Sequence, residues 1–235
     1  MEKVILFGAS NLAMVAHFYL THDSPYEVVA FTVDRNYLRK KVFLGLPVVP
    51  FEEVESIYPS SEYKMFAHLS FRDVNKFRAK KFEQGKEKGY QFISYVSSKA
   101  ITWHDLVIGE NSMICEAVVI NPYAKIGNNV MITPGSLVGH HSVIQDHCFL
   151  AAQTVILGNV TVEPYCVFGA NSTVKDGITI KRECIIGAGS YISESTRKKG
   201  VYIGKPAELM SRSSDQLSKL LSWSEDVKQK KSNSF

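Results

Sequence analysis

Residues 108–192 read IGENSMICEAVVINPYAKIGNNVMITPGSLVGHHSVIQDHCFLAAQTVILGNVTVEPYCVFGANSTVKDGITIKRECIIGAGSYI, and every sixth residue is aliphatic or aromatic. A period of six belongs neither to a helix nor to a hairpin, and it is typical of a hexapeptide-repeat β-helix. Three hexads close one triangular coil, so we predict about five coils stacked roughly 4.8 Å apart. The ladder consists of Ile108, Ile114, Ile120, Ile126, Ile132, Val138, Ile144, Leu150, Ile156, Val162, Phe168, Val174, Ile180, Ile186 and Ile192.

A second ladder lies two residues before the first, and we expect it to point inward as well. Its residues are mostly small: Ser112, Val118, Ala124, Val130, Ser136, Ser142, Cys148, Thr154, Val160, Cys166, Ser172, Ile178, Cys184 and Ser190. Three of the four cysteines fall in this ladder one coil apart, and the sequence has no Cys-x-x-Cys pair. We therefore expect buried free thiols, with a metal or redox site as the alternative.

The composition is that of a soluble globular protein of one large or two modest domains, with 235 residues, 45% hydrophobic and 21% charged. The sequence contains no run of eighteen apolar residues, so we expect no membrane-spanning helix. The first ten residues, MEKVILFGAS, do not resemble a signal peptide, so we expect a cytoplasmic location. The net charge of +4 allows phosphorylated ligands, but no basic stripe indicates nucleic-acid binding.

The first 99 residues alternate between strand and helix patterns. We expect strands at 3–9, 28–34, 45–49, 64–69 and 91–97, and helices at 12–22, 50–58 and 71–88. This alternation predicts a small doubly wound α/β domain. The predicted fold class is an α/β N-terminal Rossmann-like domain (1–99) followed by a left-handed parallel β-helix (100–210). Residues 211–235 are expected to form a short helix and a disordered tail.

The filled interior of such a β-helix leaves no internal pocket, and no loop insertion interrupts residues 108–192. Ligand sites are therefore expected on its outer faces, where these meet another subunit or the N-terminal domain. We predict a homotrimer with sites between neighbouring copies.

The densest group of titratable residues in the β-helix is the run from Gly139 to His147, GHHSVIQDH. His140 and His141 occupy positions that do not point inward, and His147 follows His141 by one hexad. A histidine suits a general base, and Asp146 is a candidate to orient a neighbouring imidazole. The alternatives are ordinary surface polarity, or a zinc ion held between subunits, although adjacent histidines do not easily bind one ion.

The turn GASN that begins at Gly8 resembles half of a dinucleotide fingerprint, with Ser10 and Ala13 in place of the second and third glycines. A turn of this kind at a helix start can place backbone N–H groups on a phosphate. Asp34 follows the second predicted strand and is a candidate to bind a ribose or a base edge. The alternative is a tight turn followed by a surface aspartate.

Together these features resemble the hexapeptide-repeat sugar acyltransferases of the sialic acid O-acetyltransferase type, which include the bacillosamine- and perosamine-pathway N-acetyltransferases. The resemblance covers residues 3 to about 210. It is carried by ILFGAS, Asp34, GLPVV, Asn75, Arg78, the repeat, and VYIGKPAELM near the C-terminal end of the repeat. It implies an acetyl-CoA-dependent N-acetyltransferase that needs no metal and acts on a nucleotide-linked amino sugar in surface-glycan biosynthesis (O-antigen, capsule or glycoprotein).

The resemblance also implies roles for individual residues. His140 falls at the family's catalytic base, but the acidic residue that usually follows it is replaced by His141, so that Asp146 is the remaining carboxylate candidate. The Ile-His-Pro signature common before the repeat is replaced by YVSS at 95–98. The implied nucleotide-sugar ligands are Gly8, Ser10, Asn11 and Asp34, and the implied acetyl-CoA contacts are Gly158, Gly169, Ala170, Lys205 and Pro206.

Two other functions stay open at this point. One is a sugar O-acetyltransferase of the sialic acid or polysaccharide type, since His140 would serve an amine or a hydroxyl acceptor. The other is a non-catalytic or metal-binding β-helix. The sequence does not name the sugar, the nucleotide or the pathway.

Overall fold

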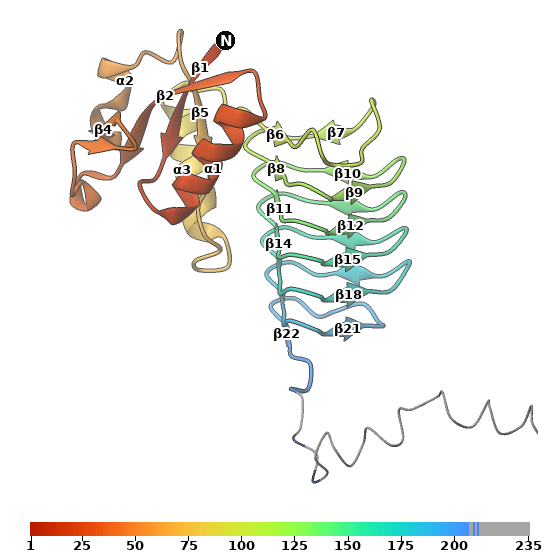
Figure 1. The fold of residues 1–235 in the computed structure, drawn as a ribbon. Coiled ribbons are helices and arrows are strands. Elements are labelled where there is room, and N and C mark those ends of the chain that lie inside the picture. Colours follow the sequence, from red (N-terminus) through yellow and green to blue (C-terminus); the bar gives the residue numbers. More distant parts are fainter. Residues whose placement is uncertain (207–208, 210, 212–235) are drawn as a thin grey trace, which may run out of the picture. The chain divides into compact units, whose positions relative to one another are not determined.

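The computed structural model describes residues 1–206, 209 and 211 (Figure 1). It divides into a compact unit, Met1–Gly204, and a second unit, Lys205–Phe235, each considered by itself. Apart from Ser211, the predicted short helix and tail at 211–235 lie outside the described residues. The division at residues 99 and 210 stays a prediction.

The N-terminal part of the first unit is built on a five-stranded sheet in the order β3-β4-β2-β1-β5. All neighbouring strands are parallel except the β3–β4 pair. The buried aliphatic runs of β1 and β2 explain why these two strands are central. The strands are β1 (Glu2–Phe7), β2 (Tyr26–Val33), β3 (Val42–Phe43), β4 (Leu46–Pro50) and β5 (Lys64–Ala67).

Helices pack on both sides of this sheet. Ala13, Ala16 and Leu20 of α1 pack on one side, and Phe82 of α3 packs on the other. The α-helices are α1 (Asn11–His22), α2 (Val54–Ile57) and α3 (Lys76–Glu87), and the 3₁₀ helices are η1 (Arg35–Tyr37) and η2 (Phe51–Glu53). Within the described residues, none of the helices has the length and apolar character that crossing a bilayer requires.

Helix α3 begins later than the pattern from residue 71 predicts. Asp73, Val74 and Asn75 all have positive φ angles, of 52°, 50° and 65°. A left-handed turn at three successive non-glycine residues is unfavourable and cannot be part of an α-helix. The hydrogen bonds made by Asn75, described below, explain why this turn is held.

The second half of the first unit is a parallel β-helix with three faces, stacked as Figure 1 shows. The first face contains β6 (Tyr95–Val96), β8 (Met113–Ile114), β11 (Met131–Ile132), β14 (Phe149–Leu150), β17 (Val167–Phe168), β20 (Ile185–Ile186) and β22 (Val201–Tyr202). The second face contains β9 (Val119–Ile120), β12 (Leu137–Val138), β15 (Val155–Ile156), β18 (Thr173–Val174) and β21 (Tyr191–Ile192). The third face contains β7 (Val107–Ile108), β10 (Lys125–Ile126), β13 (Val143–Ile144), β16 (Thr161–Val162) and β19 (Thr179–Ile180).

Both predicted ladders point into the β-helix. The aliphatic ladder is buried from Ile114 to Ile192, and Ile108 packs partly buried at its end. The small ladder is buried except at Ile178, which is partly buried, and the four cysteines are buried and free. The register of each face advances by eighteen residues per coil, as the period of six predicts, except at the last step of the first face, where Ile185 pairs with Val201. The large side chains of the first ladder and the small side chains of the second therefore fill the triangular interior together.

The segment 91–97 connects the two parts and belongs to both. Phe92 forms a parallel bridge with Met65 of β5, whereas Tyr95 pairs with Met113 on the first face. The strand expected at 91–97 is thus split between two sheets. One hydrophobic core then runs from the α1 side of the N-terminal sheet to Met113 and Met131 of the first face.

A buried polar contact also joins the two parts, and it is centred on Arg78 of α3. The Arg78 guanidinium is fully buried and donates to the carbonyl oxygens of Asn129 (2.7 Å) and Cys148 (3.2 Å). Asn75 accepts from Arg78 at 3.0 Å and donates to the Cys166 carbonyl at 3.1 Å. These two side chains therefore bind carbonyls on three successive coils.

Candidate functional site

The turns between the second and third faces stack into one edge of the β-helix, which we call the His140 corner. Tyr123, His141 and Asn159 occupy equivalent turn positions one coil apart, with φ angles of 66°, 58° and 56°. His140 precedes His141, and both imidazoles are exposed. The period that buries one side of each hexad thus presents these two histidines to solvent.

The two imidazoles form a hydrogen-bonded pair. Nδ1 of His140 lies 3.2 Å from Nδ1 of His141, and the ring of His141 packs on Tyr123 with centroids 4.7 Å apart. Only one of the two nitrogens can carry the shared proton. When His140 donates it, the lone pair of His140 Nε2 is left available, which is the form that a general base requires.

Gly158 lies against the imidazole of His140. A Cβ atom built on Gly158 would stand 2.7 Å from both Cε1 and Nε2 of that ring. The Gly158 N–H donates to Oδ1 of Asp176 at 2.9 Å, and Asn159 N–H donates to the His140 carbonyl at 2.9 Å. The missing side chain at Gly158 therefore makes room for His140, and the bonds around it hold this turn in place.

We expect Gly158→Ala to lower kcat by about 10- to 100-fold, because the added methyl group must displace the His140 ring, and misplacement of about 1 Å costs rate on that scale. The measurement is steady-state transfer kinetics. Gly177→Ala is the control on the next coil of the same corner: its φ of 72° strains an alanine, but a Cβ atom there meets open space, so it perturbs the turn without touching His140. Equal rates for the two variants would show that the Gly158 contact does not position the base.

Asp146 and His147 lie at the next corner, between the third and first faces, and not at the His140 corner. The Asp146 carboxylate accepts the Asn128 N–H at 2.7 Å and makes no described contact with His140. His147 is 8% exposed, and its Nδ1 accepts from Asn129 at 2.9 Å. The predicted grouping of His140, His141 and Asp146 is therefore only partly assembled, because one hexad moves a side chain to a different edge.

His147 ends a directional chain of hydrogen bonds. The Ala67 N–H donates to Asn111, Asn111 donates to Asn129, and Asn129 donates to His147. Burial lowers the pKa of His147 to about 4 and that of His68, which also lies in this contact region, to about 4. Both imidazoles are thus neutral structural groups at pH 7.

These depressed pKa values predict acid destabilisation. In the unfolded state these histidines bind a proton near pH 6.5, whereas in the folded state they do so only near pH 4. Their contribution to the free energy of unfolding is therefore complete above pH 6.5 and is lost as the pH falls from 6.5 toward 4. At pH 5 the loss is about 2 kcal/mol for each histidine. We expect His147→Asn, which keeps an amide acceptor and tolerates the left-handed turn, to flatten the change in unfolding free energy between pH 7.5 and 5 by about half.

Urea unfolding at the two pH values measures this effect. The control is His22→Asn, because His22 is exposed on α1. An unchanged pH slope in His147→Asn would contradict the assignment of His147 as a buried neutral group.

The predicted nucleotide-sugar residues gather at the carboxyl edge of the N-terminal sheet. Gly8, with φ of 117°, donates its N–H to the Thr32 carbonyl, and Ser10 is the N-cap of α1, which starts at Asn11. Asp34 directly follows β2, at the edge where ligands bind in parallel α/β sheets.

Asp34 is not a free carboxylate. It accepts from Nζ of Lys81 at 2.5 Å, and this ammonium also lies 5.4 Å from the ring centroid of Phe51. The pair lines a cavity of about 510 Å³. A ligand in this cavity therefore meets an Asp34 carboxylate that is already paired with the Lys81 ammonium. The sequence did not predict this pair, because Lys81 comes from a helix far along the chain.

Two further residues beside the Gly8 turn were missed. Arg39 and Lys40 line a cavity of about 150 Å³ together with Ala9. The basic run 39–41 was a visible signal, but its place next to the Gly8 turn depends on how η1 folds back from β2.

The predicted acetyl-CoA residues lie on separate edges. Gly169 and Ala170 are at the corner between the first and second faces, whereas Gly158 is at the His140 corner. The second face separates these two edges. Lys205 and Pro206 are exposed and lie outside the first unit.

Within the part of the chain that the structure describes, no group of three or more histidine, cysteine, aspartate or glutamate side chains is placed to hold a metal ion.

Two family models match the β-helix. The model described as bacterial transferase hexapeptide (six repeats) matches residues 141–176, and the hexapeptide repeat of succinyl-transferase matches residues 159–194. A comparison with curated proteins found no match. The matched segment includes His141 and Gly158, so the His140 corner lies at the start of these transferase repeats.

Solved structures extend the likeness to most of the chain. A mutant of perosamine N-acetyltransferase from Caulobacter crescentus, in complex with CoA and GDP-perosamine, is 22% identical with a TM-score of 0.77 over 89% of this chain and 97% of that one. The acetyltransferase domain of PglB from Neisseria gonorrhoeae, in complex with acetyl coenzyme A, is 17% identical with a TM-score of 0.78 over 89% of this chain and 99% of that one. WeeI from Acinetobacter baumannii is 21% identical with a TM-score of 0.73 over 88% of this chain and 99% of that one. The predicted fold class is therefore confirmed, and the chain has the fold of these acetyltransferases, a Rossmann-like domain followed by a left-handed parallel β-helix with bacterial-transferase hexapeptide repeats.

Proposed function

We propose that this protein is an acetyl-CoA-dependent N-acetyltransferase that acts on a nucleotide-linked amino sugar. The observation that carries the proposal is the exposed His140, which can donate Nδ1–H to His141 and keep Nε2 available as a base. Two of the structures that share this fold support the choice of ligands, because one was solved with CoA and GDP-perosamine and the other with acetyl coenzyme A.

His140 would act on the acceptor amine. Its Nε2 takes a proton from the amine as the nitrogen attacks the thioester carbonyl carbon. The new C–N bond forms, the C–S bond breaks, and the proton on His140 passes to the departing thiolate of CoA. Since a thioester is already activated, positioning and proton transfer are the main demands on the protein.

The pairing of His140 with a second imidazole sets this site apart from His-carboxylate pairs. His141 orients the His140 ring, but it offers no negative charge to the imidazolium that forms during attack. We expect orientation, rather than charge stabilisation, to be the contribution of His141.

The N-terminal domain would hold the nucleotide part of the acceptor. Ser10 and Asn11 place backbone N–H groups at the start of α1, whereas the Gly8 N–H is already bonded to the Thr32 carbonyl, and Arg39 and Lys40 line the adjacent cavity. Backbone amides at a helix start together with two cations suit a diphosphate. Asp34, held by Lys81, is the candidate partner for a ribose or base edge.

One chain does not bring these groups together. The contacts of the N-terminal domain with the β-helix involve the first face and its two flanking corners, through Arg78, Asn75 and Tyr19, and none of them reaches the His140 corner. The second face, between His140 and Ala170, carries the outward residues Val119, Leu137 and Val155. We therefore propose a cytoplasmic homotrimer in which a neighbouring copy completes each site.

The test is transfer of radiolabelled acetyl from acetyl-CoA to a panel of nucleotide-linked amino sugars that includes GDP-perosamine, with sedimentation on the same samples. An alkali-stable amide product supports N-acetylation. An alkali-labile ester would instead establish the O-acetyltransferase alternative, and absence of acetyl-CoA binding would leave the non-catalytic alternative. A monomer at micromolar concentration would contradict the shared site.

A further inference from the structure

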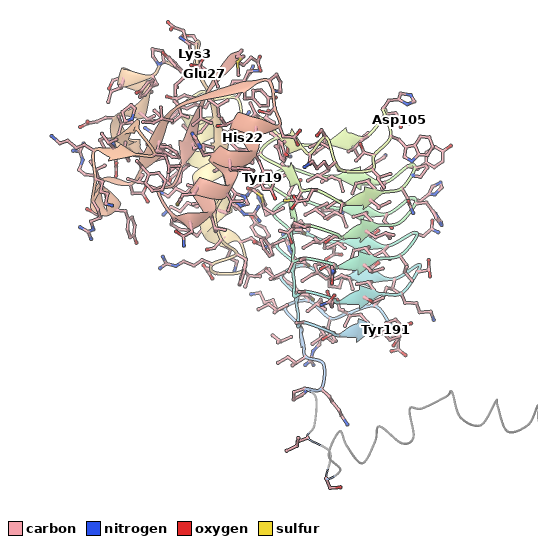
Figure 2. All side chains as sticks on the ribbon, in the orientation of Figure 1. Lys3, Tyr19, His22, Glu27, Asp105 and Tyr191 are labelled. Carbon is pink, nitrogen blue, oxygen red and sulfur yellow. The ribbon has the colours of Figure 1, made fainter. Side chains whose placement is uncertain are left out.

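The His140 corner continues away from the catalytic pair as a row of exposed aromatic rings. Tyr123, which packs on His141, is 69% exposed, and Trp103 at the first turn of the same corner is 56% exposed. Asp105, also in this turn, lies on the opposite side of the β-helix from Tyr19 and His22 of α1 in Figure 2. Rings as large as these contribute little to the filled interior when they are this exposed.

Trp103 and Tyr123 line a cavity of about 150 Å³. Leu106, Ile120 and Pro122 give it apolar walls, and Asp105, Asn121 and Lys125 are its polar lining. A cavity of about 150 Å³ holds one benzene molecule in a protein core. Its size therefore suits a single six-membered ring, and its lining combines apolar faces with a few polar groups, as ligand sites do.

We propose that the pocket between Trp103 and Tyr123 binds the pyranose ring of the amino-sugar acceptor. The C–H faces of a pyranose stack on aromatic rings, and its hydroxyl groups find an acceptor at Asp105, a donor at Lys125, and both a donor and an acceptor at Asn121. This inference rests on the proposed function and names the acceptor subsite within it.

Position favours the sugar ring over the nucleobase. The pocket reaches His140 through only two contacts, Tyr123 on His141 (4.7 Å between centroids) and His141 on His140 (3.2 Å between Nδ1 atoms). In a nucleotide sugar, the base is separated from the reacting ring by a ribose and a diphosphate. The ring that carries the amine is therefore the one that fits beside the base His140.

Trp103 offers a binding readout that does not need turnover. The sequence has two tryptophans, Trp103 and Trp223, so Trp223→Phe leaves Trp103 as the single reporter in the full chain. In this background we would titrate GDP-perosamine and a UDP-linked 4-amino sugar, with GDP and UDP alone as parallel arms. We expect a saturable change in Trp103 emission with at least one sugar nucleotide, and Tyr123→Ala should abolish or weaken it at least tenfold.

Kinetics give the second readout. Loss of the aromatic residue on which a nucleobase stacks changes affinity by roughly 10- to 100-fold, and we expect the same scale for a stacked pyranose. Tyr123→Ala and Trp103→Ala should therefore raise the KM for the acceptor by about 10- to 100-fold and leave the KM for acetyl-CoA unchanged. Phe18→Ala, which removes an equally exposed ring from α1, is the matched control.

Three results would overturn the assignment. One is an acceptor that is acetylated without any change in Trp103 emission. Another is an equal response to GDP or UDP alone, which would place the base in the pocket. The third is loss of assembly in the aromatic variants at unchanged acceptor KM. If Trp103 responds to the sugar nucleotides while no acetyl group is transferred, the subsite stands and the proposed acetyl transfer fails.

Discussion

Replacing His140 by alanine is expected to lower kcat by about 10²- to 10⁴-fold, the range that loss of a general base produces. The imidazole is exposed and its Nδ1 is engaged with His141, so Nε2 is the one ring nitrogen left for the acceptor. Because alanine removes the base without filling space, the KM values for both substrates should change little. Steady-state kinetics with the preferred sugar nucleotide measures this.

Two companion variants sharpen this prediction. His141→Asn keeps a residue that tolerates the left-handed turn and removes the partner of His140, so its kcat should fall by less, about 10-fold. His22→Ala, on α1, should leave the rate unchanged. A rate for His140→Ala within a factor of two of the parent would remove His140 from the chemistry.

Replacing Arg78 by alanine is expected to lower the free energy of unfolding by about 3–5 kcal/mol, because it leaves buried acceptors unpaired and removes a large buried side chain. The Asn129 and Cys148 carbonyls would lose their donor, Asn75 would lose its contact, and a large buried cavity would remain. Burial lowers the pKa of Arg78 to about 9, so the group is still charged at pH 7. The loss is a large share of a total stability of about 5–15 kcal/mol.

Urea unfolding measures this change. Lys80→Ala is the matched control, since Lys80 is exposed on the same helix, and it should change stability by no more than about 0.5 kcal/mol. Arg78→Lys separates charge from geometry, because one ammonium cannot reproduce the planar fork that serves two acceptors. Equal stability of Arg78→Ala and Lys80→Ala would show that the buried network does not hold the two parts together.

The α/β domain followed by a β-helix was predictable because local patterns repeat. A side chain that recurs every sixth residue meets the same environment in every coil, so Ile114 and Ile186 pack into the same hydrophobic core. The boundaries were less predictable. Helix α3 starts at Lys76 because buried bonds of Asn75 override the helical pattern before it.

The candidate site was predictable in part. The histidine pair could be read from the run GHHSVIQDH, since both residues occupy outward turn positions of one hexad. The place of Asp146 could not, because a shift of six residues moves a side chain to another corner. The partner of Asp34 was also hidden, since Lys81 follows it by 47 residues and comes from α3.

The sequence by itself determined the β-helix, the three buried thiols of its small ladder and the exposure of His140, because each depends only on phase within a period of six. Only the tertiary structure decided which polar residues share an edge. It buried His147 in the contact with the N-terminal domain, placed the ring of His140 over Gly158, and put Tyr123 beside His141. The physical reason is that residues eighteen apart become neighbours only when coils stack, whereas contacts across the two parts depend on how the N-terminal domain packs on one face.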